Sequence, residues 1–495
     1  MKNILVICLL LMISKGYSQD STQTIKRRQV ELDFAKIETE GKYWKRVLFS
    51  SPILFIDSND FQFAFTPLWD GEAGKYGEEI TYQNTRGAMI QGQFQGKLKF
   101  GSAIFENQSM APDFVDEYVN ETYVYPGGTR VKNFKEGGFD YYYASSYLNY
   151  QPSKYFQAEV GHGKHFIGEG YRSLLLSDNA FNYPYLKLQT DFWKIKYTNL
   201  YAELIDFYGT GNSDHLFQKK YFSTHTLDFE VTKWLNIALF ETVIWEKGDT
   251  TNPRGIELQY LNPVIFLRPV EFSVGSPDNV MMGMNIKSTP FKGLTIYGQI
   301  ILDEFLLREI RAKSGWWANK YGGQIGAKYD LDIQDHKLSA LVEYNIVRPF
   351  TYTHFNRYNN YGHYNQAFAH PRGANFKEFV IKGSYEYKGI YAQGKLNMLT
   401  YGADIQGDSL TYGGDLFISY NNHAKEFGNF IGQGELNLIN FYEARVGYII
   451  NPITNMRLEA ALLRRDHTAN GVNTVTNWIT LGFKTQIGNR YFDFL

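Results

Sequence analysis

The chain has a single cysteine, Cys8, which lies in an apolar run near the N-terminus. That run, residues 4–13, follows a positive charge and precedes small residues at Gly16 and Ser18, the layout of a secretory signal peptide over residues 1–18. A lipoprotein signal is the alternative, but bulky residues precede Cys8 where a lipobox needs small ones. Cleavage of the signal leaves no cysteine, which excludes disulfides and thiol chemistry.

Long apolar runs and an excess of one charge are also absent. No stretch after the signal approaches the about 20 apolar residues of a transmembrane helix. This excludes a helical membrane protein. The formal net charge is −1, and it becomes slightly more negative once Lys2 and Lys15 leave with the signal. The mature chain therefore offers no general basic surface for nucleic acid.

Aromatic residues and glycine are abundant instead. The sequence holds 38 Tyr, 37 Phe and 45 Gly, while hydrophobic residues reach only 44%. A membrane β-barrel has such a composition because apolar and polar residues alternate along each strand and average out. A soluble β-sandwich or propeller has it too, so composition alone leaves both open.

Strict alternation extends over segments of barrel-strand length. In residues 337–347, Leu338, Val342 and Tyr344 share one face, while Glu343 and Asn345 are among the residues on the other. The same pattern recurs in three further segments, residues 294–303, 391–399 and 456–462. Strands of about 10 residues cross a bilayer when tilted. This favours an all-β, transmembrane antiparallel β-barrel.

The connections alternate between short and long. Short turns are predicted at residues 95–96, 151–154, 191–192, 232–234, 288–292, 332–335, 387–389 and 451–454. Long segments are predicted at residues 106–137, 164–184, 246–278, 348–376 and 401–433. In outer-membrane barrels short turns are periplasmic and long loops extracellular, which here gives about 18 strands. If residues 415–420 form a further hairpin, the number becomes about 20. We favour the smaller barrel.

The barrel is expected over residues 60–495, after a short periplasmic lead or helical plug over residues 19–59. A disordered tether is the alternative for the lead. The chain ends in an aromatic-rich tail, residues 489–495, which is typical of barrel-assembly signals.

A glycine-rich and basic motif over residues 161–173 is the first candidate site. It is not a P-loop, because the residue after Gly163-Lys164 is histidine where Ser or Thr is needed. Its two histidines lie three residues apart, but no ligand set completes a metal site. We predict a tightly folded loop at the barrel mouth in which Arg172 pairs with Glu169 or Asp178. Contact with a ligand is the alternative.

A second candidate site lies on the long loop that begins near residue 348. Planar aromatics there stand among amides, histidines and arginines, a composition that suits stacking against sugar C–H faces and hydrogen bonding to hydroxyls. The alternative is a self-bonded loop that closes the barrel mouth. The predicted glycan-binding residues are Tyr352, His354, Arg357, Tyr358, Tyr361, His363, Tyr364, Asn365 and His370.

No catalytic constellation is recognisable. Ser, His and Asp all occur, but no G-x-S-x-G elbow or other ordered set appears. We therefore expect no catalytic activity, no cofactor and no metal.

Several segments together resemble the Wzi-like capsule-assembly outer-membrane proteins, most nearly the Bacteroidota branch that includes the gliding-motility protein RemB. The similar stretches are residues 82–87, 166–178, 262–271, 275–279, 315–320 and 360–375. The resemblance runs from about Phe61 to Leu495. It implies an 18-stranded barrel, a helical lead on the periplasmic side and a surface lectin role in holding capsular polysaccharide. For the gliding branch it implies a part in surface motility.

Three functions remain open at this point. The first is a non-enzymatic outer-membrane barrel that anchors surface polysaccharide and supports capsule assembly. The second is an interaction component of gliding or secretion machinery, with proteins as partners. The third is a diffusion channel. The expected surroundings are the lipid of the outer membrane, reached by export through the cleaved signal.

Overall fold

The computed structural model describes residues 25–28, 31–210, 213, 216–248, 254–263, 269–270, 278–485 and 490–495. The predicted signal peptide, residues 1–18, lies outside the described residues.

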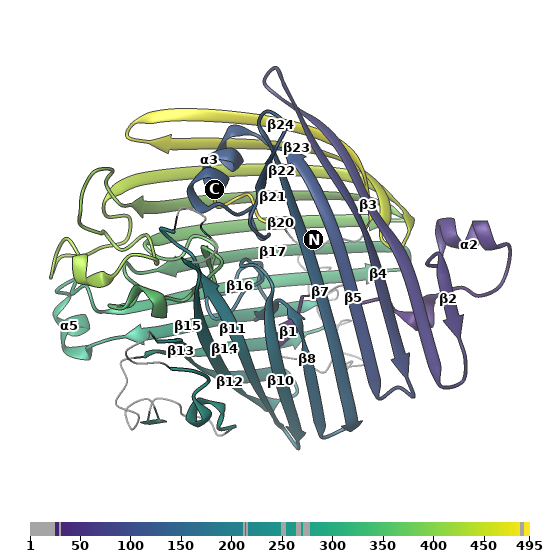
Figure 1. Ribbon diagram of the computed structural model, residues 1–495, viewed down its shortest axis with the longest axis horizontal. Helices are drawn as coiled ribbons and strands as arrows, with labels where there is room; N and C mark the ends of the chain where they lie inside the picture. Colours follow the sequence, from purple (N-terminus) through teal and green to yellow (C-terminus); the bar gives the residue numbers. More distant parts are fainter. Residues whose placement is uncertain are drawn as a thin grey trace, which may run out of the picture.

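Eighteen antiparallel strands of the described chain close into a barrel (Figure 1). The ring closes where β24 pairs with β3, the first of the eighteen. The barrel strands are β3 (Phe61–Tyr76), β4 (Glu79–Phe94), β5 (Leu98–Met110), β7 (Gly138–Ser153), β8 (Phe156–Gly163), β10 (Tyr183–Phe192), β11 (Ile195–Asp206), β12 (Gln218–Thr232), β13 (Leu235–Glu246), β14 (Asn279–Phe291), β15 (Leu294–Glu304), β16 (Lys320–Ile333), β17 (His336–Val347), β20 (Phe376–Tyr387), β21 (Ile390–Ala403), β22 (Glu435–Asn451), β23 (Met456–Ala469) and β24 (Val472–Lys484).

Two short strands extend the wall without adding to the ring. β2 (Leu54–Asp57) pairs with β3 beyond the end of β24, and β6 (Lys132–Phe134) pairs with β7 beyond the end of β8. The remaining elements lie in the connections or in the N-terminal segment. They are β1 (Ile25–Arg27), β9 (His165–Ile167), β18 (Gly362–His363), β19 (Gln366–Ala367), α2 (Tyr43–Phe49), α3 (Asp113–Thr122), α5 (Leu307–Ala312), η1 (Phe34–Lys36), η3 (Leu258–Leu261), η4 (Arg357–Asn359) and η5 (Tyr420–Asn422).

The connections at one end of the barrel are all short, whereas those at the other end are long except for the two-residue turns at 77–78 and 470–471. The turn between β4 and β5 is typical of the short ones, because Gln95 and Gly96 both have positive φ, 51° and 65°. Two such residues form the hairpin turn whose twist matches that of the strands. Residues 415–420 lie inside the connection from β21 to β22, which confirms the prediction of 18 strands over 20.

The two faces of the strands differ as the alternation predicted. On β17, Leu338, Val342 and Tyr344 are exposed on the outside, whereas Glu343 and Asn345 are fully buried inside. Exposed apolar side chains recur on the outer face of other strands, among them Ile104 on β5, Ile300 on β15 and Leu462 on β23, so the wall presents a belt that suits hydrocarbon. None of the helices in the described chain has the length and apolar character needed to cross a membrane.

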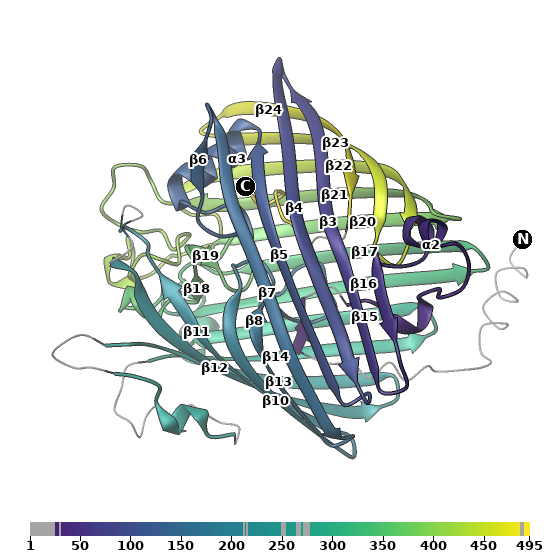
Figure 2. The ribbon, with the colours of Figure 1, turned by 45° about the vertical axis from the view of Figure 1, so that its right-hand side comes forward.

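Segments that leave the wall fill the lumen. β1 pairs with β9 inside the ring of strands (Figures 1 and 2). The last barrel strand ends at Lys484, and Tyr491, Asp493 and Phe494 of the aromatic tail are buried in the interior. The end of the tail therefore lies inside the barrel and not in its wall. We refer to β1, the tail and the inward-folded connections β8–β10 and β17–β20 together as the plug.

The apolar belt generates a prediction about a single outward side chain. Ile325, in the middle of β16, is 64% exposed. We expect Ile325→Arg to destabilise the barrel in lipid by roughly 2–4 kcal/mol, since arginine is costly at the middle of a bilayer. The measurement is the midpoint of unfolding in liposomes. Leu258→Arg, at an exposed loop position, serves as the control, and equal effects of both variants would contradict a lipid-facing β16.

Candidate functional site

Arg172 is the centre of a buried ion-pair network in the lumen. It belongs to the connection between β8 and β10, and its side chain is 1% exposed. Its Nη2 donates to Glu378 Oε1 at 2.9 Å and to Asp493 Oδ1 at 2.8 Å. Glu378 comes from barrel strand β20, and Asp493 comes from the C-terminal tail. One side chain thereby joins three segments that are far apart in the sequence.

Further side chains bind the carboxylates of Glu378 and Asp493. His370 Nε2 lies 2.7 Å from Glu378 Oε2. The hydroxyl of Tyr171 donates to Asp493 Oδ2 at 2.7 Å, and Lys395 Nζ lies 3.1 Å from the same oxygen. Burial alone would raise the pKa of Asp493, but the neighbouring guanidinium and Lys395 outweigh burial and hold this pKa well below its ordinary value. Asp493 is therefore charged at neutral pH and fixes the tail in the lumen.

The backbone of the β8–β10 connection is also bound to the wall. Glu343 of β17 accepts from the N–H groups of Tyr171 at 2.8 Å and Arg172 at 3.0 Å, and from the hydroxyl of Tyr297 at 2.8 Å. A Cβ at Gly170 would lie 2.1 Å from Glu343 Oε2, so only glycine allows this approach. This is the close backbone packing that the glycine-rich motif predicted.

The basic run at residues 26–28 is held by three carboxylates of the lumen. The lysine Nζ lies 3.0 Å from Glu169 Oε1. The first arginine pairs with Glu159, and Nε of the second lies 3.6 Å from Asp178 Oδ2. This clamp was not predictable from the sequence, because a basic run gives no sign of its partners.

The predicted pairing of Arg172 with Glu169 or Asp178 is wrong. Arg172 binds Glu378 and Asp493 instead, while Glu169 and Asp178 bind the N-terminal strand. All three residues do lie in the plug. Glu169 and Asp178 are near Arg172 in the sequence. In the closed barrel, however, the opposite wall and the C-terminal tail lie closer to its guanidinium than these neighbours do.

The nine predicted glycan-binding residues lie in the β17–β20 connection, which folds into the barrel mouth. Arg357, Tyr358 and Tyr364 are partly exposed. The other six are buried: Tyr352, His354, Tyr361, His363, Asn365 and His370.

Two of the buried tyrosines form internal hydrogen bonds of the plug. The hydroxyl of Tyr352 donates to the carbonyl oxygen of Leu174 at 2.7 Å, and that of Tyr361 donates to the carbonyl oxygen of Leu175 at 2.6 Å. Both acceptors belong to the β8–β10 connection. These rings therefore join two inward-folded connections and present no face to an external sugar.

His363 joins its connection to barrel strand β11 and to the β8–β10 connection through its two ring nitrogens. Its Nδ1 accepts from the N–H of Ile205 at 3.0 Å, and its Nε2 lies 3.2 Å from the carbonyl oxygen of Asn182. This arrangement needs a neutral ring that carries its proton on Nε2. Burial lowers the pKa of His363 to about 3, which is consistent with the neutral form.

Aromatic rings that are accessible from outside gather from three connections at the loop end of the barrel. We define the outer aromatic patch as Trp316, Trp317, Phe355, Tyr420 and His423. The ring centroid of Trp317 lies 4.6 Å from that of His423 and 4.8 Å from that of Tyr420. Phe355 is exposed, and the other four are half-buried.

A carboxylate organises the two tryptophans. Glu426 Oε1 accepts from Trp316 Nε1 at 2.8 Å, and Glu426 Oε2 accepts from Trp317 Nε1 at 3.2 Å. The Trp-Trp pair stood out in the sequence only as part of a resemblance. Its association with residues 420–426 depends on two loops meeting at the barrel mouth, which no local pattern signals.

The chain was compared with known proteins. No family model and no curated protein matches the sequence. Among solved structures, the chain is similar to Wzi of Escherichia coli, a carbohydrate-binding β-barrel of the outer membrane involved in group 1 capsule assembly. The TM-score is 0.52, with 12% identity over 86% of this chain and 85% of Wzi.

The chain is also similar to porins, with lower TM-scores. OprD of Pseudomonas aeruginosa has a TM-score of 0.42 and 11% identity, covering 88% of this chain and 97% of OprD. A BenF-like porin of Pseudomonas fluorescens has a TM-score of 0.43 and 9% identity, covering 86% and 99%. The similarity to Wzi confirms the predicted Wzi-like barrel fold.

The network around Arg172 yields a prediction about stability. Arg172→Met leaves the carboxylates of Glu378 and Asp493 buried without their main partner, which costs about 3–5 kcal/mol. We expect a large drop in the midpoint of thermal unfolding of the detergent-solubilised barrel. Arg308→Met, at an exposed position of α5, is the matched control. A midpoint equal to that of the control would show that the network does not hold the plug.

The neutral ring of His363 yields a prediction about pH. Its pKa falls from 6.5 to about 3 on folding, so only the unfolded chain takes up this proton between those values. The stability contributed by His363 is thus complete above pH 6.5 and is lost as the pH falls toward 3. In a plot of the unfolding midpoint against pH, His363→Gln should reduce the fall of the midpoint at acid pH. His336→Gln, at the exposed start of β17, is the matched control, and a curve for His363→Gln that matches wild type would refute this role.

Proposed function

We propose that this chain is a non-enzymatic outer-membrane barrel that binds surface polysaccharide and supports capsule assembly. The observation that carries the proposal is the plug in the lumen, which is bound to the wall by buried ion pairs centred on Arg172, Glu378 and Asp493. A barrel built in this way is suited to holding a ligand at its mouth rather than to passing solutes. The same plug weighs against the diffusion channel.

The outer aromatic patch is the surface that we propose for the glycan. Trp316 and Trp317 offer flat apolar faces against which sugar C–H groups pack. Glu426 and the partly exposed Arg357 and Tyr358 supply polar groups for hydroxyls. The predicted glycan site thus moves from the buried part of the β17–β20 connection to its exposed edge and the two neighbouring loops.

The similarity in fold to a capsule-assembly barrel supports this proposal. Wzi of Escherichia coli is described as a carbohydrate-binding barrel involved in capsule assembly. A shared fold raises the expectation of a related role, although a fold hosts many functions.

A protein partner is the second candidate, as in the gliding or secretion machinery. It is favoured by exposed apolar side chains next to the outer aromatic patch, since such side chains are common at protein interfaces. They belong to two loops that contact each other, where the N–H of Gly428 donates to the carbonyl oxygen of Ser314 at 2.8 Å. The exposed apolar residues are Phe305, Leu306, Leu307, Phe427 and Phe430.

The proposal predicts where surface polysaccharide is found. In a deletion strain we expect polysaccharide to move from washed cells into the medium, and the intact gene should restore retention. The double variant Trp316→Ala, Trp317→Ala should fail to restore it, because the stacking faces are lost. Trp193→Ala, an exposed tryptophan at the short-turn end, is the control and should restore it fully.

The outcomes separate the candidates. An unchanged ratio of cell-bound to released polysaccharide in the deletion strain would refute the anchor. Loss of gliding or secretion with normal retention would favour the protein partner. Correct assembly of each variant is checked by the amount of heat-resistant folded barrel in the outer membrane.

A further inference from the structure

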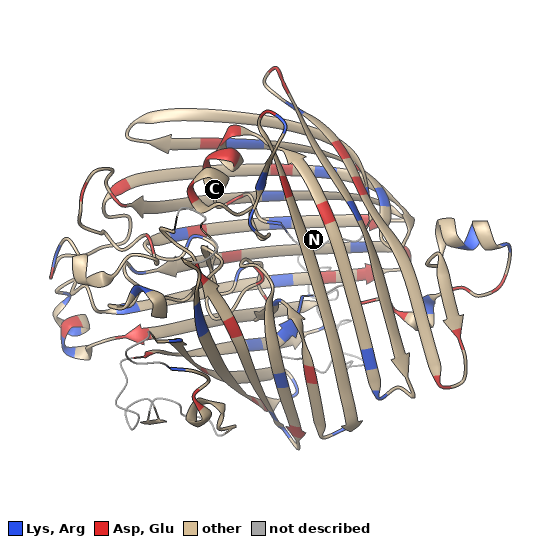
Figure 3. Ribbon diagram, viewed as in Figure 1, with Lys and Arg blue, Asp and Glu red and all other residues tan. Residues whose placement is uncertain are grey.

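The lumen contains a cavity of about 1040 Å³ beside the plug. It reaches the rim at the short-turn end, where Asp332, Lys337, Glu386 and Asn455 line it. Figure 3 shows that acidic and basic residues are interspersed along the barrel strands. A cavity of this size matches ordinary small-molecule sites, which span about 300–1,000 Å³.

The strand register places two lysines opposite each other in the wall of this cavity. Lys382 on β20 is the direct cross-strand partner of Lys395 on β21. One step toward the short-turn end, Ser384 faces Gln393, and Gln393 faces Arg445 on β22. Like charges directly opposite each other on neighbouring strands are destabilising. The wall therefore carries an unfavourable pair of charges next to a row of hydrogen-bond donors.

The neighbouring cations of this wall have carboxylates within reach. Lys395 Nζ lies 3.2 Å from Glu443 Oε2, and Arg445 Nη1 lies 2.8 Å from Glu459 Oε1. The other pairs in the row are Arg457 with Glu459 at 3.3 Å and Lys484 with Glu459 at 2.9 Å.

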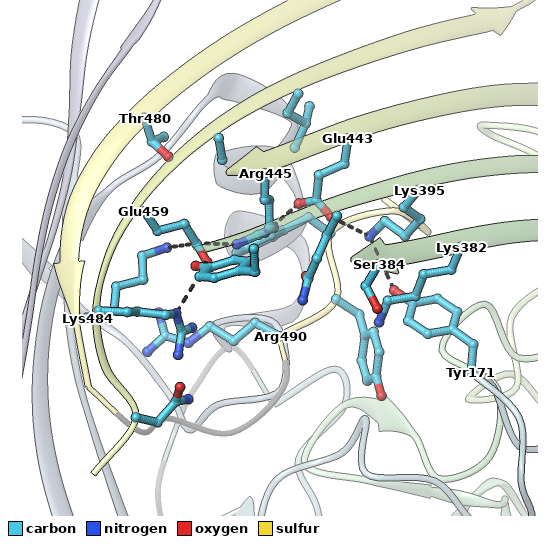
Figure 4. Close-up of a pocket in the computed structure, with 18 of the residues that line it drawn as sticks. Tyr171, Lys382, Ser384, Lys395, Glu443, Arg445, Glu459, Thr480, Lys484 and Arg490 are labelled. Atoms are coloured by element: carbon cyan, nitrogen blue, oxygen red, sulfur yellow. Dashed lines mark hydrogen bonds and ion pairs between the residues drawn. The ribbon is translucent and has the colours of Figure 1, made fainter. Parts of the chain in front are cut away.

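Lys382 is different from these neighbours. Among the residues that the structure describes, no carboxylate lies within 4 Å of its Nζ, which sits 5.2 Å from the ring centroid of Tyr171. Figure 4 shows Lys382, Ser384 and Tyr171 at one side of the cavity, with Arg445, Glu459 and Lys484 at the other. Lys382 is thus a positive charge in the cavity wall that no carboxylate of the described residues pairs directly.

We propose that Lys382, Ser384 and Gln393 form a binding site for one anionic group that enters the barrel from the short-turn end. The group is a carboxylate, as on a uronic acid, or a phosphate ester. It would accept hydrogen bonds from the ammonium, the hydroxyl and the amide, and it would cancel the repulsion between Lys382 and Lys395. Charge-assisted hydrogen bonds of this kind are stronger than neutral ones.

The site is formed by other elements than the outer aromatic patch, because Lys382, Ser384 and Gln393 belong to the wall strands β20 and β21 and the patch belongs to three long connections. Glu443 and Asp493 lie nearby but are already bound to Lys395. The negative charges of Glu443 and Asp493 would repel a ligand with several anionic groups. The site therefore suits a single anion at Lys382. The inference therefore does not depend on the proposed function, and its test does not involve polysaccharide retention.

The test is calorimetric titration of the purified, detergent-solubilised full-length barrel at low salt. The probes are sodium D-glucuronate, inorganic phosphate and, as a neutral control, D-glucose. We expect at least one anion to bind more tightly than glucose. Lys382→Met should weaken that binding about tenfold, as the loss of one charge-assisted hydrogen bond implies. Lys328→Met, which removes a cavity lysine that pairs with Asp330, should leave it unchanged.

Each outcome has a defined meaning. Tighter binding of glucuronate assigns a sugar carboxylate, and tighter binding of phosphate assigns a phosphate ester. Equal binding of anions and glucose, no binding of either anion, or equal anion binding by wild type and Lys382→Met would overturn the site.

A second measurement needs no ligand. Because Lys382→Met removes the like-charge pair, it should raise the unfolding midpoint of the empty barrel. Lys395→Met removes the partner of Glu443 and Asp493 and should lower it. A lower midpoint for Lys382→Met would mean that Lys382 stabilises the wall itself, and this too would overturn the proposal.

Discussion

The guanidinium of Arg172 bound to Glu378 and Asp493 is the interaction on which the interior of this barrel depends. A buried charge is costly, and it is tolerated only where its partners are fixed in good geometry. Here each partner comes from a different part of the chain: an inward connection, a wall strand and the C-terminal tail. The network can therefore form only when the ring is closed and the tail has entered the lumen.

The two ends of the barrel differ in the groups that they present. At the loop end, three connections meet and present the outer aromatic patch. At the short-turn end, a charged cavity reaches the rim, and its wall holds Lys382. The plug fills the lumen beside this cavity, which supports a holding role at the surface rather than the passage of solutes.

The wall was predictable because its signal is local. Alternation such as Leu338 and Val342 against Glu343 follows from the geometry of a single strand, and the spacing of the turns follows from strand length. The interior was less predictable. Aromatic and amide residues between 352 and 370 have the same composition whether they face sugar or pack into a plug, and burial of Tyr361 and His363 depends on segments more than a hundred residues away.

The sequence by itself determined an aromatic-rich barrel with 18 strands, because periodicity and turn spacing depend only on neighbouring residues. The tertiary structure decided what each charged side chain does. Arg172 had plausible partners in Glu169 and Asp178, but it binds Glu378 and Asp493, which lie 206 and 321 positions further along the chain. Likewise Lys382 and Lys395 become opposed only through the register of β20 and β21. Electrostatic pairing acts through space, and only the closed ring of strands sets those distances.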